Sequence, residues 1–230
     1  MRDPAPNHYK VLDVEFIAGG KPLKRSFAEH GFASLAVPVE SKPEPEKVLA
    51  DLSSDWTITS FAGANAPSAP LVVKKLMSWS ESSDPRLRYF SGRAVYEKSI
   101  VPSSLVPPRS SLILDLGDVH DIANVYINGK FIVCLWEPPY RLTLDLSDSR
   151  LLNLRIELVN TWPNRMIGDA IARKAGAAEP KRNGYPEWVL DDRPDSGTGI
   201  FTWSNFDYGW KATDKPLPAG LVGPVRILER

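Results

Sequence analysis

"ANVYINGKFIVCLW", Ala123 to Trp136, decides the fold because it holds the clearest turn signal of the chain. Two apolar runs flank Asn128-Gly129, a pair that accepts positive φ at both central positions of a type I′ turn. The stretch therefore predicts a β-hairpin of two antiparallel strands. Cys134, the single cysteine of the chain, lies in the second apolar run, and we expect it to be a buried small hydrophobic residue.

Segments with alternating apolar and polar residues continue on both sides of this hairpin. They cover Asp55–Phe61, Ser91–Pro102, Ser111–Gly117, Arg141–Ser147 and Leu151–Asn160. Short strands at this spacing, with turn residues between them, are typical of an antiparallel sandwich. The 21 Pro and 15 Gly among 230 residues agree, because both residue types favour turns over long helices. We predict an all-β, antiparallel β-sandwich.

The N-terminal part of the chain carries its own β-signals. Val11–Ile17 alternates, and Ala33–Val39 fits a second short strand. "ESKPEPEK", Glu40 to Lys47, is charged and proline-spaced, which is typical of a semi-rigid linker. We therefore divide the chain into an N-terminal β-segment, residues 1–45, and the sandwich, residues 46–230.

From Thr161 to about Gly199 the strand periodicity stops, which predicts a long irregular loop. Only "NRMIGDAIARKAGA", Asn164 to Ala177, fits a short helix, with Pro163 suited to its first turn. Arg165 and Asp169 are four residues apart and are spaced for an ion pair that pins this loop. Strand-like sequence returns at Gly199–Trp203 and at Gly223–Leu228.

The charge balance excludes several classes of function. Lys plus Arg and Asp plus Glu both number 28, so the net charge is zero, whereas a nucleic-acid binder has a basic excess. The first ten residues, "MRDPAPNHYK", lack the apolar core of a signal peptide, and no apolar run is long enough to cross a membrane. We expect neither a nucleic-acid nor a membrane partner, and no signal peptide in this chain.

Short motifs for catalysis and metal binding are weak in this sequence. "DSGT", Asp195 to Thr198, matches an aspartic-protease string, but it occurs once and the chemistry needs two, so a glycine turn is the preferred interpretation. The three histidines have no zinc spacing. Asp118 and Asp121 are the candidates for a structural calcium site, with a solvated strand-end turn as the alternative. We predict no other cofactor.

Glycosidase chemistry needs two positioned carboxylates. The candidates lie in aromatic surroundings: Glu137, Glu187, Asp191 and Asp192. Because spacing alone marks no pair among them, a stand-alone glycoside hydrolase is the third hypothesis.

Aromatic residues next to polar ones recur at loop positions, and this pattern suits carbohydrate. Aromatic rings stack on the CH faces of sugars, and amide or guanidinium groups bind the hydroxyls. The candidate carbohydrate-binding residues are Trp136, Tyr140, Trp162, Asn164, Arg165, Tyr185, Trp188 and Trp210. The alternative for each aromatic residue is ordinary packing of the core or of a loop.

Three segments together resemble one known kind of module. They are Tyr89–Pro102 ("YFSGRAVYEKSIVP"), Leu114–Asp148 ("LDLGDVHDIANVYINGKFIVCLWEPPYRLTLDLSD") and Leu154–Asp169 ("LRIELVNTWPNRMIGD"). They resemble the galactose-binding-like sugar-binding domain of family 2 glycoside hydrolases, and most of all the C-terminal module of large bacterial α-L-rhamnosidases. The ending, Phe201–Leu228, is similar to the close of that module, and the resemblance covers roughly Val48–Arg230.

The resemblance implies a jelly-roll sandwich in an extracellular or periplasmic bacterial protein that degrades polysaccharide. In that family the catalytic carboxylates lie in a separate barrel, and a chain of 230 residues is too short to hold barrel and sandwich together. The resemblance thus implies a non-catalytic carbohydrate-binding module whose partners are a polysaccharide or oligosaccharide and the parent's catalytic domain. The alternative is a structural accessory domain without sugar affinity. Residues 1–45 would be the tail of a preceding β-domain or strands packed on the sandwich.

Overall fold

The computed structural model describes residues 11–18, 21–28, 46–101, 112–144, 151–193, 196–203 and 209–229. The chain forms two compact units, Met1–Pro45 and Glu46–Arg230. In the first unit, β1 (Val11–Ala18) pairs antiparallel with β2 (Lys21–Ala28). The second strand thus follows the first directly, whereas the segment predicted for it, residues 33–39, lies outside the described residues.

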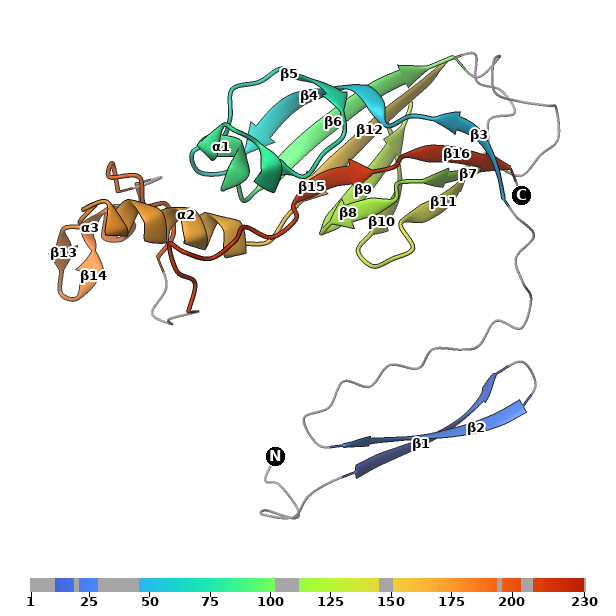
Figure 1. Ribbon diagram of the computed structural model, residues 1–230, viewed down its shortest axis with the longest axis horizontal. Helices are drawn as coiled ribbons and strands as arrows, with labels where there is room; N and C mark the ends of the chain where they lie inside the picture. Colours follow the sequence, from blue (N-terminus) through green and yellow to red (C-terminus); the bar gives the residue numbers. More distant parts are fainter. Residues whose placement is uncertain are drawn as a thin grey trace. The chain divides into compact units, whose positions relative to one another are not determined.

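The second unit is built from two main antiparallel sheets (Figure 1). The larger sheet has the strand order β10-β9-β12-β6-β4-β5, and the smaller sheet has the order β11-β7-β16-β3. The strands of the larger sheet are β4 (Ser54–Ala62), β5 (Leu71–Lys75), β6 (Arg93–Ile100), β9 (Ile122–Ile127), β10 (Lys130–Leu135) and β12 (Leu152–Val159). Those of the smaller sheet are β3 (Lys47–Asp51), β7 (Leu112–Asp115), β11 (Arg141–Leu144) and β16 (Arg226–Glu229). A further pair joins β8 (Asp118–His120) to β15 (Gly220–Gly223).

The hydrophobic core lies between the two main sheets. Trp56 and Tyr96 enter it from the larger sheet, and Leu114 and Ile227 enter it from the smaller one; all four are buried. Trp79 donates a hydrogen bond from its Nε1 to the Tyr96 hydroxyl at 2.6 Å, which satisfies the polar atoms of two buried rings. The predicted all-β sandwich is confirmed.

The hairpin of β9 and β10 forms as its sequence predicts. Asn128 has φ 48° and Gly129 has φ 81°, the positive values that a type I′ turn requires. However, β10 is the outermost strand of its sheet, and Cys134 is exposed there. The expectation of a buried cysteine is therefore wrong. Side chains of a strand alternate between its two faces, so an apolar run on an edge strand turns only some of its residues towards the core.

Helices gather at two places in the second unit. The 3₁₀ helix η1 (Trp79–Glu81) and α1 (Pro85–Arg88) lie between β5 and β6. The predicted helix is α2 (Pro163–Lys174), which begins at Pro163 and extends from the end of β12 away from the sheets (Figure 1). Near its far end are α3 (Glu187–Leu190) and the short pair β13 (Lys181–Arg182) and β14 (Tyr185–Pro186). The strand predicted for Gly199–Trp203 is wrong, because this segment is irregular.

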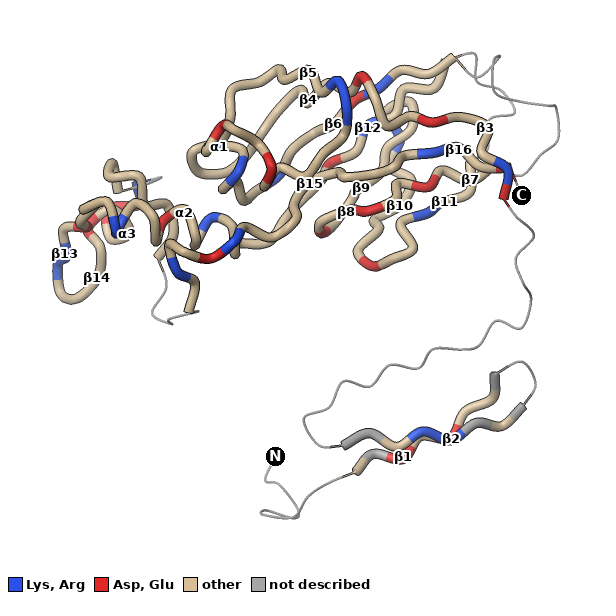
Figure 2. The backbone as a smooth tube through the Cα atoms, viewed as in Figure 1, with Lys and Arg blue, Asp and Glu red and all other residues tan. Residues whose placement is uncertain are grey.

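Charges of both signs are interspersed along the second unit (Figure 2). This distribution agrees with the balanced composition of the chain. Among the described residues, no helix is long and apolar enough to cross a membrane.

Candidate functional site

Two neighbouring cavities share His120 and Asp121, and we refer to them together as the β8 groove. The larger cavity has a volume of about 460 Å³ and is bordered by β8 and by the loop from Pro138 to Arg141. The smaller one, about 180 Å³, is bordered by the end of β12 and the start of α2. The groove thus forms where strand ends and loops of the sandwich meet.

The larger cavity combines an aromatic ring with polar groups. The Tyr140 hydroxyl donates a hydrogen bond to the Asp121 carbonyl oxygen at 3.1 Å. Burial raises the pKa of Tyr140, and the nearby Asp121 charge adds to the rise, so this hydroxyl stays protonated. Arg141 is fixed by an ion pair with Asp115 at 2.7 Å. Asp118 is exposed at the cavity, where a carboxylate can accept hydrogen bonds from hydroxyl groups.

The smaller cavity is bordered by polar side chains that hold the backbone. Asp121 accepts hydrogen bonds from the Thr161 backbone N–H and hydroxyl, both at 2.9 Å. Asn164 is only 3% exposed, and its amide makes two hydrogen bonds with the backbone of Leu217, at 2.7 and 2.8 Å. These contacts fasten the start of α2 to Asp121 and to the chain before β15, so the cavity is rigidly framed.

Two exposed tryptophans lie in the segments that border the groove. Trp136 is 66% exposed and follows β10, two residues before Pro138 of the larger cavity. Trp162 is 55% exposed and stands between Thr161 and Pro163, which both line the smaller cavity. Exposed indole rings of this kind are available to stack on a ligand.

Arg165 and Asp169 do not form the predicted ion pair. Both side chains are buried, yet no ion pair within 4.0 Å joins them in the described part of the chain. The Asp169 carboxylate instead accepts hydrogen bonds from the Phe201 N–H at 3.1 Å, the Thr202 N–H at 2.7 Å and the Thr202 hydroxyl. The expected ion pair is therefore wrong, because backbone donors remote in sequence take up the carboxylate.

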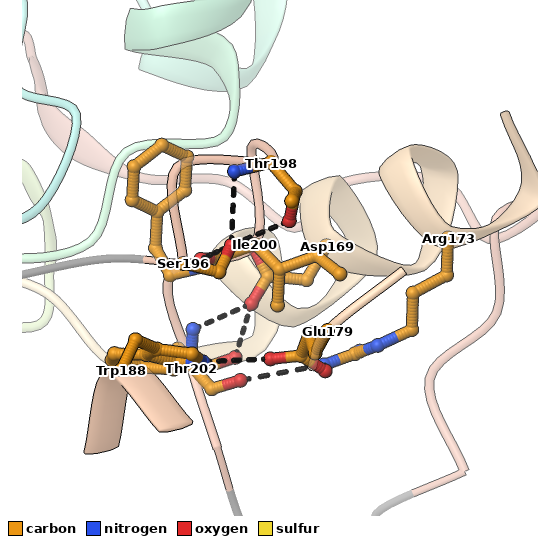
Figure 3. A network of polar contacts seen from close by, with 9 residues as sticks. Asp169, Arg173, Glu179, Trp188, Ser196, Thr198, Ile200 and Thr202 are labelled. Carbon is orange, nitrogen blue, oxygen red and sulfur yellow. Dashed lines mark hydrogen bonds and ion pairs between the residues drawn. The ribbon is translucent and has the colours of Figure 1, made fainter. Parts of the chain in front are cut away.

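The same network continues along α2 (Figure 3). Arg173 forms an ion pair with Glu179 at 3.3 Å, and Glu179 accepts a hydrogen bond from Trp188 Nε1 at 2.9 Å. Trp188, which the sequence analysis predicts to bind sugar, is thus buried and held by Glu179. The network holds α2, Glu179 and Trp188 together in a part of the chain where the described residues form only the short strands β13 and β14.

The remaining predicted binding residues do not line the two cavities of the β8 groove. Tyr185 is half exposed in β14, and its ring centroid is 5.3 Å from that of Trp203. Trp210 is half-buried. The structure therefore places Trp136, Tyr140, Trp162 and Asn164 at or beside the groove, whereas Tyr185 and Trp188 lie near the far end of α2.

The described residues contain no group of three or more His, Cys, Asp and Glu side chains that could hold a metal ion. Asp118 and Asp121, the calcium candidates, both border the larger cavity, where Asp121 is already bonded to Thr161. The calcium site stays a prediction.

The four carboxylates named as glycosidase candidates come from two separate places. Glu137 lies in the loop after β10, whereas Glu187 begins α3 and Asp191 follows that helix. Asp191 forms an ion pair with Arg182 at 2.7 Å.

Sequence reasoning missed His120 as a groove residue, and it considered Asp121 only for calcium. The string "GDVHD", Gly117 to Asp121, was the available signal, because it places polar side chains where a strand ends. This string does not show that the end of β12 and the start of α2 lie beside the end of β8.

Comparison with known proteins gives a consistent picture. No protein-family model matches the chain. A putative β-glucuronidase of Formosa agariphila is 34% identical over an alignment of 208 residues, which covers 84% of this chain and 16% of that protein. The solved rhamnosidase of Novosphingobium sp. PP1Y is 27% identical with a TM-score of 0.61, covering 94% of this chain and 19% of that one. This chain therefore spans less than a fifth of each of these two relatives, and it is related to glycoside hydrolases.

Proposed function

We propose that this chain is a non-catalytic carbohydrate-binding module of a multidomain bacterial glycoside hydrolase of the rhamnosidase type. The sandwich is a galactose-binding-like jelly roll, and an oligosaccharide or polysaccharide binds at the β8 groove. The observation that carries this proposal is the exposed Trp136 in the loop that borders a cavity of about 460 Å³, whose lining includes Asp118 and Arg141. A sugar needs both features, a ring to stack on and polar groups for its hydroxyls.

The groove provides different contacts at its two ends. Trp136 and Tyr140 supply aromatic surface beside the larger cavity, where Asp118 accepts hydrogen bonds from sugar hydroxyls. Trp162 supplies the aromatic surface beside the smaller cavity. The hydrogen bonds of Asp121 and Asn164 hold the walls in place before a ligand arrives, which lowers the entropic cost of binding.

The lengths of the relatives support the proposal that sugar binding and catalysis belong to different domains. More than four-fifths of the Formosa protein and of the Novosphingobium rhamnosidase lie outside the part that this chain matches. We assign catalysis to a separate domain of the parent protein, and we place that parent outside the cytoplasm, where polysaccharide is degraded.

Isothermal titration calorimetry with oligosaccharides that contain rhamnose or galactose tests the proposal. We expect saturable binding that weakens by about tenfold or more in Trp136→Ala, because loss of a stacked ring removes on the order of 1–3 kcal/mol. Trp162→Ala should weaken the binding of longer oligosaccharides more than that of short ones. Phe131→Ala is the matched control, an exposed ring at the opposite end of β10. Equal loss in the control, or no binding to any oligosaccharide, would contradict the proposal.

A structural role on the parent's catalytic domain is the second candidate, and β10 favours it. This edge strand exposes Phe131 and Ile132 next to Cys134, and exposed apolar strand edges are typical docking surfaces. In this case a thiol reagent should label Cys134 quickly in the isolated chain and slowly in the full-length parent. Equal labelling rates in both proteins would remove this candidate.

A further inference from the structure

A third cavity, of about 340 Å³, lies between α2 and the loops around Tyr89 and Phe201. We call it the Arg165 cavity, and it shares no lining residue with the β8 groove. Ile171 and Ala172 contribute apolar surface from α2. Gly168 lets the helix approach closely, since a Cβ at this position would lie 2.9 Å from the Tyr89 side chain.

Among the described residues that line this cavity, Arg165 is the single cationic side chain, and no ion pair within 4.0 Å compensates its charge. Its side chain is 4% exposed, and neither Nε nor Nη2 has a hydrogen-bond partner among the described residues. The guanidinium lies over the Phe201 ring, 4.9 Å from the centroid. The nearest buried carboxylate, that of Asp169, is engaged by the backbone of Phe201 and Thr202. A buried cation in this state is costly unless a further group pairs with it.

The position of Arg165 in its helix also favours an anionic partner. It lies in the first turn of α2, where the helix dipole disfavours a cation and favours an anion, and this turn has no acidic residue. Burial lowers the pKa of the Arg165 guanidinium, and the Asp169 charge only partly opposes this. The local field and the unpaired N–H groups therefore both favour an anionic partner.

We propose that the Arg165 cavity binds the carboxylate of a small sugar acid through the Nε–Nη2 edge of Arg165, which is closed to solvent in the free chain and turns into the cavity when the acid binds. This edge presents two parallel donors, the geometry that a carboxylate accepts with both oxygens. One cation in a cavity whose other lining residues are uncharged matches a single negative charge better than the double charge of a phosphate. The volume fits a small-molecule ligand of monosaccharide size, and Tyr89 and Phe201 offer rings for its CH faces. This site goes beyond the proposed function, and it does not depend on sugar binding at the β8 groove.

Titration of the complete 230-residue chain with D-glucuronate, followed by calorimetry, tests the site. D-glucose is the neutral control, and acetate reports the carboxylate alone. We expect saturable binding of glucuronate, weaker binding of acetate and none of glucose at the same concentrations. Equal responses to glucuronate and glucose, or no response to either carboxylate, would overturn the proposal.

Two variants locate the binding. Arg165→Lys keeps the charge but removes the parallel donors, and we expect about tenfold weaker binding of glucuronate. Ala172→Phe fills the cavity without touching a polar group, and it should abolish binding while circular dichroism confirms the fold. The second variant keeps the test valid if Arg165→Lys fails to fold. Unchanged affinity in Ala172→Phe would show that glucuronate binds elsewhere and would refute the site.

Trp136→Ala separates this site from the proposed function. The variant removes aromatic surface at the β8 groove, so oligosaccharide binding there should weaken while glucuronate binding stays unchanged. Loss of glucuronate binding in this variant would place the acid in the groove and overturn the separate site.

Discussion

At the scale of single residues, Asn164 is the clearest test of how the start of α2 is held. Asn164→Ala leaves both the N–H and the carbonyl of Leu217 without their side-chain partner. We expect the free energy of unfolding to fall by about 1–3 kcal/mol, the usual cost of such a loss in a buried position. Chemical denaturation measures it. Trp162→Ala, two residues earlier and exposed, should change stability by only about 0.5 kcal/mol, and an equal loss there would contradict the explanation.

Asp169 makes stability depend on pH with a sign opposite to that of most acidic groups. Burial raises the pKa of Asp169 above its ordinary value of 3.8, although hydrogen bonds from Thr202 and Phe201 oppose the rise. Between the unfolded and the folded pKa, the folded chain binds more protons, so its stability falls as pH rises through this interval. Asp169→Asn removes the titration. As pH rises from about 4, we expect the free energy of unfolding of the wild type to fall relative to that of the variant. A constant difference between the two proteins would refute this.

Residue-level predictions from sequence succeeded where the relevant partner is close in the chain. The positive φ values at Asn128 and Gly129 follow from two adjacent residues. The ion pair of Arg165 with Asp169 failed, because the true partners of Asp169 are 32 and 33 residues away. Trp188 shows the same limit, since aromatic character in a loop does not distinguish a ring held by Glu179 from one exposed to a ligand.

At the scale of elements, the β9–β10 turn isolates a backbone effect. Gly129 has φ 81°, and a Cβ added there would meet nothing within 4 Å. Gly129→Ala should therefore lower stability by about 1–2 kcal/mol through backbone strain alone. Gly129→Asn should lose less, because Asn tolerates left-handed conformations. Thermal unfolding of the three proteins compares them, and equal losses for Ala and Asn would argue against strain.

Strands within a long alternating segment were predictable, and isolated short ones were not. β4, β6 and β12 have eight or nine residues and were all predicted. β3, β5 and β8 were missed, whereas β7, β11 and β16, with four residues each, were predicted because they lie in alternating segments of six or seven residues. The Gly199–Trp203 segment reads as a strand, but its N–H groups at Phe201 and Thr202 bind Asp169 instead of a neighbouring strand.

At the scale of the whole molecule, the core of the second unit draws its residues from Leu49 onward. A chain that begins at Glu46 therefore keeps every residue of this core. We expect it to unfold in one cooperative step at the same denaturant midpoint as the corresponding transition of the complete chain. A broad transition, or a markedly lower midpoint, would show that residues 1–45 contribute to the stability of the sandwich.

The place of β16 in the smaller sheet has a consequence for how the protein is made. In the order β11-β7-β16-β3, only β16 joins β3 to the other strands, and Arg226 pairs with Asp51 across most of the chain. A ribosome must therefore deliver residue 229 before this sheet can close. Until β16 pairs with them, β3 and β7 each have an unpaired edge on the side that β16 occupies. Contacts between residues so distant in sequence form slowly. The growing chain therefore exposes these strand edges until β16 has been synthesised.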